Sequence, residues 1–138
     1  MEVDKMKIML VDDEERYLST TSRLLERKGY NAVTAASGTE ALAKLKSSSI
    51  HVIILDMKMP GIDGMEILKN IKQDFPLAEV IILTGHGTME SAVDGLKAGA
   101  SDYMVKPVYI DNLIRKAEEA FDRRLKIEEK IRMARSGK

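Results

Sequence analysis

The sequence predicts an α/β fold, a doubly wound parallel sheet with helices on both faces. Short apolar runs of strand length recur along the chain and alternate with segments in which apolar residues repeat at helical spacing. Three of these runs, at 8–11, 52–55 and 80–83, are apolar throughout. Strands that are buried on both faces of a parallel sheet have this composition. A length of 138 residues allows one domain with a single core.

The elements follow from these runs in order. Five runs rich in Val, Ile, Leu or Met are expected to be strands: Lys7–Val11, Asn31–Ala35, Val52–Leu55, Val80–Leu83 and Tyr103–Val105. Apolar stripes mark intervening helices at Ala41, Leu42 and Leu45, and at Met89, Ala92, Val93 and Leu96. Both stripes are expected to face the sheet. Alternating strands and helices imply right-handed crossovers and place ligands beyond the carboxyl ends of the central strands.

The last helix is unusually long, because no Gly or Pro interrupts the segment from Ile110 to Arg132. We therefore place the domain at residues 1–122 and treat 123–138 as an extension of the final helix or a linker. Apolar residues recur along the segment at near-heptad spacing, at Leu113, Ala117, Ala120, Ile127, Ile131 and Ala134. Two interpretations stay open, a short dimeric coiled coil and a solvated charged extension.

Composition excludes several classes of protein. The 22 Lys and Arg residues balance the 22 Asp and Glu residues, so no basic surplus favours direct binding of nucleic acid by this chain. The chain has no cysteine, which rules out disulfides and thiolate metal sites. The apolar stretch after the charged N-terminus is too short for a signal peptide or a membrane span. We expect a cytoplasmic protein with no membrane partner.

Functional side chains follow the expected strands at one edge of the sheet. Asp12 and Asp13 come after the first strand, Asp56 after the third, Thr84 after the fourth and Lys106 after the fifth. Clustered carboxylates repel one another unless a cation neutralises them or some pKa values rise. Oxygen ligands favour a hard ion, and few carboxylates plus water suit Mg²⁺ better than Zn²⁺. The predicted cofactor is Mg²⁺.

With the ion bound, Asp56 could attack a phosphoryl group as a carboxylate nucleophile. Mg²⁺ and Lys106 would spread the charge, and the Thr84 hydroxyl could bond one phosphoryl oxygen. Each residue also has a structural interpretation, because acids such as Asp12 and Asp13 commonly cap helices. An acid that closes an apolar strand, as Asp56 does, costs stability unless it is used. Side chains suited to phosphoryl chemistry follow four of the expected strands, and this coincidence favours the functional interpretation over the structural one.

Four segments resemble the receiver domains of two-component response regulators: Val11-Asp12-Asp13, Leu55-Asp56-Met57-Lys58-Met59-Pro60-Gly61, Leu83-Thr84-Gly85 and Val105-Lys106-Pro107. The resemblance spans about residues 6 to 120. It implies a flavodoxin-like fold with strand order 2-1-3-4-5 and five helices, the last one extended here. It also implies a signalling switch rather than an enzyme, one that catalyses only its own phosphorylation and dephosphorylation.

The resemblance assigns roles to matching positions: the metal-binding acids Asp12 and Asp13, the phosphoacceptor Asp56, the switch hydroxyl Thr84 and the salt-bridging Lys106. The backbone carbonyl of Lys58 would complete the metal shell. Tyr103 would be a switch aromatic that turns inward, although it could simply be a half-buried strand residue. Lys58 and His86 would influence the phosphoryl lifetime, although His86 could be an ordinary loop residue. The bond before Pro107 would be cis or otherwise rigid.

The expected donor is a sensor histidine kinase or a phosphotransfer protein. Phosphorylation would remodel the face made by the helix with Met89 and Leu96, the strand Tyr103–Val105 and the last helix, for a partner or for self-association. The chain would be a stand-alone regulator or the N-terminal receiver of a longer transcription regulator. A dehalogenase-like phosphatase is the enzymatic alternative, but it needs an acid where Lys58 stands. A nucleotide- or flavin-binding module would need a phosphate-binding loop, and the sequence has no such motif.

Overall fold

The computed structural model describes residues 6–59, 62–85 and 89–137. Seven strands lie at Lys7–Val11 (β1), Asn31–Ala35 (β2), Val52–Asp56 (β3), Lys58–Met59 (β4), Ile62–Asp63 (β5), Glu79–Thr84 (β6) and Asp102–Val105 (β7). Five helices lie at Glu15–Arg27 (α1), Gly38–Ser47 (α2), Gly64–Asp74 (α3), Met89–Lys97 (α4) and Ile110–Ser136 (α5). The five expected strands are all present, and Asp56 and Thr84 are the last residues of β3 and β6.

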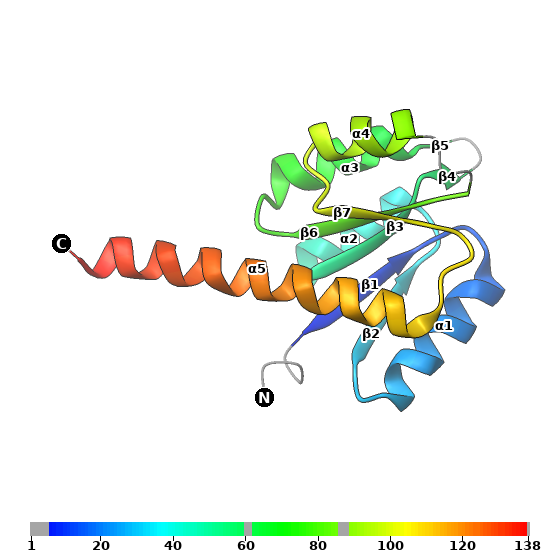
Figure 1. Ribbon diagram of the computed structural model, residues 1–138, viewed down its shortest axis with the longest axis horizontal. Helices are drawn as coiled ribbons and strands as arrows, with labels where there is room; N and C mark the ends of the chain where they lie inside the picture. The colour runs from blue at the N-terminus through cyan, green and yellow to red at the C-terminus, as the bar shows by residue number, and fades with distance from the viewer. Residues whose placement is uncertain (1–5, 60–61, 86–88, 138) are drawn as a thin grey trace.

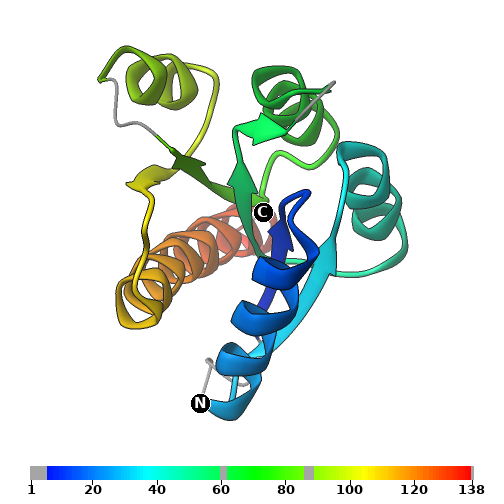
Figure 2. The same cartoon turned by 90° about the vertical axis from the view of Figure 1, so that its right-hand side faces the viewer.

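The main sheet has five parallel strands in the order β2-β1-β3-β6-β7. This confirms the predicted doubly wound sheet and its 2-1-3-4-5 order, since β6 and β7 are the fourth and fifth strands of that sheet. Figure 2 shows α1 and α5 on one face of the sheet, and α2, α3 and α4 on the other. β4 and β5 form a separate two-stranded antiparallel sheet after β3, which the sequence analysis did not predict.

Each central strand contributes to two cores, because successive side chains point to opposite faces. Ile53 and Leu55 pack on the side of α2 and α3, whereas Val52 and Ile54 pack on the side of α1 and α5. The side chains of all four are buried. This two-sided burial explains why the strand sequence is apolar throughout.

The prediction for α4 was wrong in part. Ala92 is buried as expected, but Val93 and Leu96 are 38% and 40% exposed. The helix instead turns Gly95 toward β6, where a side chain at position 95 would collide with Ile82. Close approach at Ala92 and Gly95 rotates Val93 and Leu96 outward.

Helix α5 continues to Ser136, four residues beyond the predicted end at Arg132, and Figure 1 shows it projecting past the sheet. Its middle is held at the amino ends of the strands. Arg123 Nε lies 3.2 Å from Glu79 Oε1, and Arg124 Nη1 donates to the Ile50 carbonyl at 2.9 Å. None of the helices in the described part of the chain has the length and apolar character that a membrane crossing requires.

Candidate functional site

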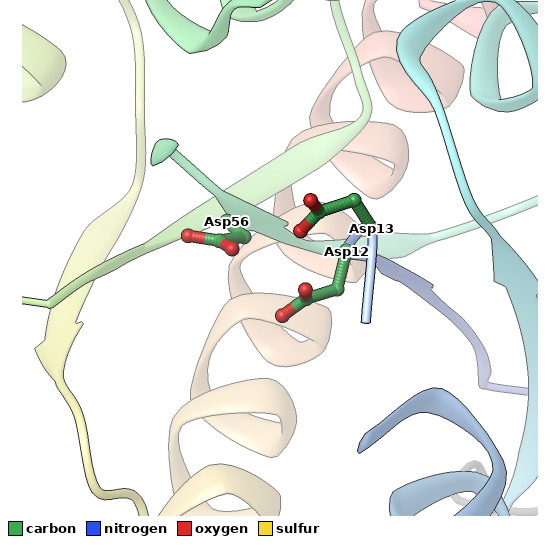
Figure 3. Close-up of side chains that lie close together, drawn as sticks. All are labelled: Asp12, Asp13 and Asp56. Atoms are coloured by element: carbon green, nitrogen blue, oxygen red, sulfur yellow. The ribbon is translucent and has the colours of Figure 1, made fainter. Parts of the chain in front are cut away.

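Three carboxylates meet at the carboxyl ends of β1 and β3, as Figure 3 shows. Asp12 and Asp13 follow β1 and Asp56 ends β3, and one oxygen of each lies within 4.8 Å of the others. Asp12 and Asp56 are 1% and 3% exposed, whereas Asp13 is open to solvent. The structure therefore brings together the three acids that the sequence analysis selected, on a site that solvent reaches from one side.

Backbone amides orient the two buried acids. The amide of Glu14 donates to Asp12 Oδ1 at 3.0 Å, and the amide of Lys58 donates to Asp56 Oδ1 at 3.1 Å. The loop behind Asp56 is held by close packing, since a side chain at Gly64 would come within 2.7 Å of the Met57 carbonyl oxygen. The second carboxylate oxygens of both acids are thereby directed into the site.

Lys106 joins the two buried acids from the end of β7. Its ammonium lies 3.2 Å from Asp56 Oδ2 and 3.3 Å from Asp12 Oδ2. Burial alone lowers the pKa of Lys106, but the combined attraction of Asp56 and Asp12 is larger and the pKa is raised. Burial raises the pKa of Asp56 and outweighs the lowering effect of the Lys58 amide, and Asp12 raises this pKa further. The lysine stays charged, and the site remains short of positive charge.

Thr84 completes the edge from the end of β6. Its hydroxyl is buried and has no hydrogen-bond partner among the described residues. A buried polar group without a partner costs free energy, and such groups are rare in native proteins, where a catalytic role or a bound water or ion commonly accounts for them. We call Asp12, Asp13, Asp56, Thr84 and Lys106 together the carboxyl edge.

Tyr103 lies in β7, where it is paired in register with Ile82. It is half-buried and packs against the core on the α2 and α3 side. Ile82 and Thr84 are two residues apart on β6, so Tyr103 and the Thr84 side chain lie on the same face of the sheet. The Lys106-Pro107 bond is cis, as the resemblance implied. Lys58 is exposed, and His86 lies outside the described residues.

The donor set fits a hard divalent cation. Its three side-chain donors are carboxylate oxygens, which suit Mg²⁺, and the exposure of Asp13 leaves room for water ligands. A cation here would also offset the burial of Asp56 and its repulsion by Asp12, which together raise the pKa of Asp56. The residues present therefore suit Mg²⁺.

The sequence analysis missed one neighbour of the site. Lys106 Nζ lies 5.6 Å from the centroid of the Tyr17 ring, within the range of a cation–π interaction. Tyr17 is on α1, one turn beyond Asp13. The signal in the sequence is weak, because an aromatic residue in the first turns of a helix usually belongs to the core.

The fold and the site together define a doubly wound α/β domain whose acidic cluster, lysine and buried hydroxyl gather at the carboxyl ends of the parallel strands. Comparison with known proteins agrees, since the model of the response regulator receiver domain matches residues 8–118. The chain belongs to the response regulator receiver domain family. Members of this family take phosphoryl groups from histidine kinases in two-component systems.

Among curated proteins, an NtrX-like response regulator of Rickettsia felis is 40% identical over 114 residues, which cover 81% of this chain and 24% of that protein. The transcriptional regulatory protein ZraR of Escherichia coli is 37% identical over 117 residues, covering 85% of this chain and 26% of that protein. The chain thus spans about a quarter of the length of the curated relatives it matches.

Solved structures agree on the fold. A receiver domain protein of Clostridium thermocellum is 41% identical with a TM-score of 0.83, covering 88% of this chain and 98% of that one. NtrX of Brucella abortus, solved in complex with ADP, is 32% identical with a TM-score of 0.84, covering 96% of this chain and 30% of that one.

Proposed function

We propose that Asp56 accepts a phosphoryl group from a sensor histidine kinase or a phosphotransfer protein, in a Mg²⁺-dependent reaction. The observation that supports this most strongly is the placement of Asp56. It is buried, it lies within reach of two further carboxylates, and its free oxygen faces the ammonium of Lys106. A buried ionised acid raises the free energy of the folded state. Such destabilising acids are typical of functional sites, which favours a role for Asp56 in phosphoryl transfer.

The roles divide among the residues of the carboxyl edge. Asp56 Oδ2 would form the new bond to phosphorus as the bond to the leaving group breaks, and the leaving group would keep the bonding electrons. Asp12, Asp13, Asp56 and the Lys58 carbonyl would hold Mg²⁺, which when bound neutralises charge on the transferring group. Lys106 would exchange one carboxylate partner for a phosphoryl oxygen. The Thr84 hydroxyl would donate to another phosphoryl oxygen and so gain the partner it lacks among the described residues.

Movement of Thr84 toward the phosphoryl group would leave space on the face of the sheet where Tyr103 packs. We propose that Tyr103 then turns inward and that the α4-β7-α5 face changes shape for a partner or a second copy. Val93, Leu96 and Val105 on this face are each more than a third exposed, as a docking face requires. Lys58 and His86 are our candidates for tuning the lifetime of the phosphoryl group.

We also propose that this receiver acts in the cytoplasm, alone or at the N-terminus of a transcription regulator. Support comes from ZraR, a transcriptional regulatory protein, because the match with this chain covers 26% of the length of ZraR. The balanced charge of the chain argues against DNA binding by the receiver itself.

Helix α5 is a second candidate for self-association. Leu113, Ala117 and Ala120 are buried against the sheet, but Ile127 and Ile131 are 40% and 36% exposed. We propose a domain at 1–122 and an extension at 123–138, of which Arg123 and Arg124 still contact the domain and the part from Ile127 onward is available to pair. Truncation after residue 122 is expected to keep phosphorylation and lose any dimer, and truncation after 136 is the matched control. Sedimentation that finds a monomer in both forms would contradict pairing through α5.

The proposed chemistry is tested by intact mass after incubation with Mg²⁺ and acetyl phosphate. Wild type is expected to gain one phosphoryl adduct. The adduct is expected to be absent in Asp56→Asn and in wild type with a chelator. Equal labelling of wild type and Asp56→Asn would refute the proposal.

A further inference from the structure

Lys106 has two carboxylates and an aromatic ring as neighbours. Asp12 and Asp56 lie 3.3 and 3.2 Å from its ammonium. The ammonium also lies over the Tyr17 ring, 5.6 Å from its centroid. The side chain of Lys106 remains 33% exposed, so the carboxylates alone do not enclose it.

The space beside Lys106 is large enough for the side chain to move. A surface cavity of about 520 Å³ lies between α1 and the segment after β7, and Tyr17, Thr21, Lys106 and Val108 are among its lining residues. A lysine has long, flexible rotamers, and holding it in one geometry costs side-chain entropy. Without the ring, the ammonium could turn into this cavity and solvate there, away from Asp56.

Tyr17 is well placed to prevent that movement. It sits on α1, the helix that begins directly after the acid pair, and buried Thr21 lies one turn further along. Burial raises the pKa of the Tyr17 phenol against the lowering effect of its hydrogen bond with Thr21, so the ring stays neutral. A neutral aromatic face attracts an ammonium ion, and the attraction is stronger where water is excluded.

We propose that Tyr17 is a positioning residue for phosphoryl transfer. Its ring holds the Lys106 ammonium between Asp12 and Asp56, where the charge of the transferring group develops. The inference rests on the proposed function, and it concerns how this chain places its lysine rather than whether Asp56 is the acceptor.

The expected effect is on the rate of the reaction, not on metal binding. In Tyr17→Leu, the second-order rate constant for adduct formation from acetyl phosphate falls about fivefold, as loss of about 1 kcal/mol of attraction implies. The Mg²⁺ concentration that gives half the maximal rate stays the same. Tyr17→Phe keeps the aromatic face and stays within about twofold of wild type. Tyr109→Leu, an exposed tyrosine elsewhere, is the matched control.

A double-mutant cycle separates positioning from a merely structural role. If Tyr17 acts through Lys106, then Tyr17→Leu changes nothing further in a Lys106→Ala background. The same fivefold loss in both backgrounds would overturn the proposal. A wild type that is never labelled would refute the proposed function, and this inference with it. A labelled wild type whose rate equals that of Tyr17→Leu would refute the inference alone.

Nuclear magnetic resonance tests the geometry without catalysis, and the wild-type spectrum alone can contradict the proposal. The ε-methylene protons of Lys106 should resonate upfield of those of the other lysines because of the Tyr17 ring current. The upfield shift should persist in Tyr17→Phe and vanish in Tyr17→Leu. Lys106 protons at the position of ordinary lysines in wild type would overturn the proposal even if no variant folds.

Discussion

The two ends of the parallel strands differ in whether their buried polar groups have partners within the chain. At the carboxyl edge, two buried acids share one lysine and the Thr84 hydroxyl has no partner among the described residues. At the opposite end, which we call the amino edge, Glu79 accepts from Ser101 and pairs with Arg123, and Arg124 donates to the Ile50 carbonyl. At the amino edge the polar groups are paired with one another. At the carboxyl edge the acids outnumber the cations, and the Thr84 hydroxyl lacks an acceptor among the described residues.

This difference indicates which edge of such a sheet carries the functional site. Polar groups at both edges are buried, so burial alone does not identify a site. The distinction is whether the partners are already present in the folded chain. At the carboxyl edge the missing partners are a cation and the phosphoryl oxygens of the proposed reaction. Changes at the two edges should therefore have opposite consequences.

The largest expected effect is loss of Mg²⁺ binding at the carboxyl edge. Asp13→Ala removes the solvent-exposed carboxylate of the cluster, and we expect Mg²⁺ affinity to fall about 100-fold, the upper end of what weaker perturbations of metal sites produce. Isothermal titration calorimetry measures it. Asp74→Ala, which removes an exposed acid from the end of α3, is the matched control and should bind Mg²⁺ normally. Equal affinity in the two variants would remove Asp13 from the site.

The next effect is on stability, and its sign should differ between the edges. Glu79→Ala leaves Arg123 and Ser101 without their shared partner and should destabilise the protein by about 2 kcal/mol. Asp56→Asn removes a carboxylate whose raised pKa shows that its charge is unfavourable in the folded state. Without Mg²⁺ it should therefore be neutral or stabilising. Urea unfolding measures the free energy of unfolding of both variants and of wild type. A lower value for Asp56→Asn than for wild type would contradict the proposed difference between the edges.

The smallest effect is a pH dependence from His51 at the amino edge. His51 Nδ1 accepts the Lys7 amide at 3.0 Å, and its ring packs edge-on against Phe121. Burial, with Arg124 nearby, lowers the pKa of His51 from its usual 6.5. Below pH 6.5 the unfolded chain therefore binds a proton that the folded state does not, and stability falls as pH falls toward the lowered value.

His51→Asn provides the test, because an amide can still accept the bond from Lys7 but does not titrate. Thermal unfolding between about pH 5 and pH 8 should show a shallower fall in stability toward acid in this variant than in wild type. Identical pH profiles would show that His51 does not distinguish the folded from the unfolded state.

The sequence predicted the sheet and the acidic cluster because both depend on patterns that are local. Unbroken apolar runs mark strands buried on both faces, and the residue after each run marks the carboxyl edge. The position of α4 depended instead on a long-range contact, the fit of Gly95 against Ile82, which no periodicity encodes. The same holds for Tyr17, whose relation to Lys106 exists only once α1 and β7 are placed.

The amino edge was also invisible in the sequence. Glu79 and Arg123 are 44 residues apart, and each by itself looks like a solvated charge. Because Arg123 pairs with Glu79, the first residues of the proposed 123–138 extension contact the domain. The sequence pattern had indicated only that residues 123–138 extend the final helix or form a linker.

The most direct test of the account is to locate the phosphoryl group itself. Protein labelled with acetyl phosphate and Mg²⁺ is treated with borohydride, which reduces an aspartyl phosphate to homoserine, and the peptides are then sequenced by mass spectrometry. The account predicts homoserine at position 56 alone, with Asp12 and Asp13 unchanged. Homoserine at position 12 or 13, or a phosphate that resists reduction because it sits on a hydroxyl such as that of Thr84, would contradict it.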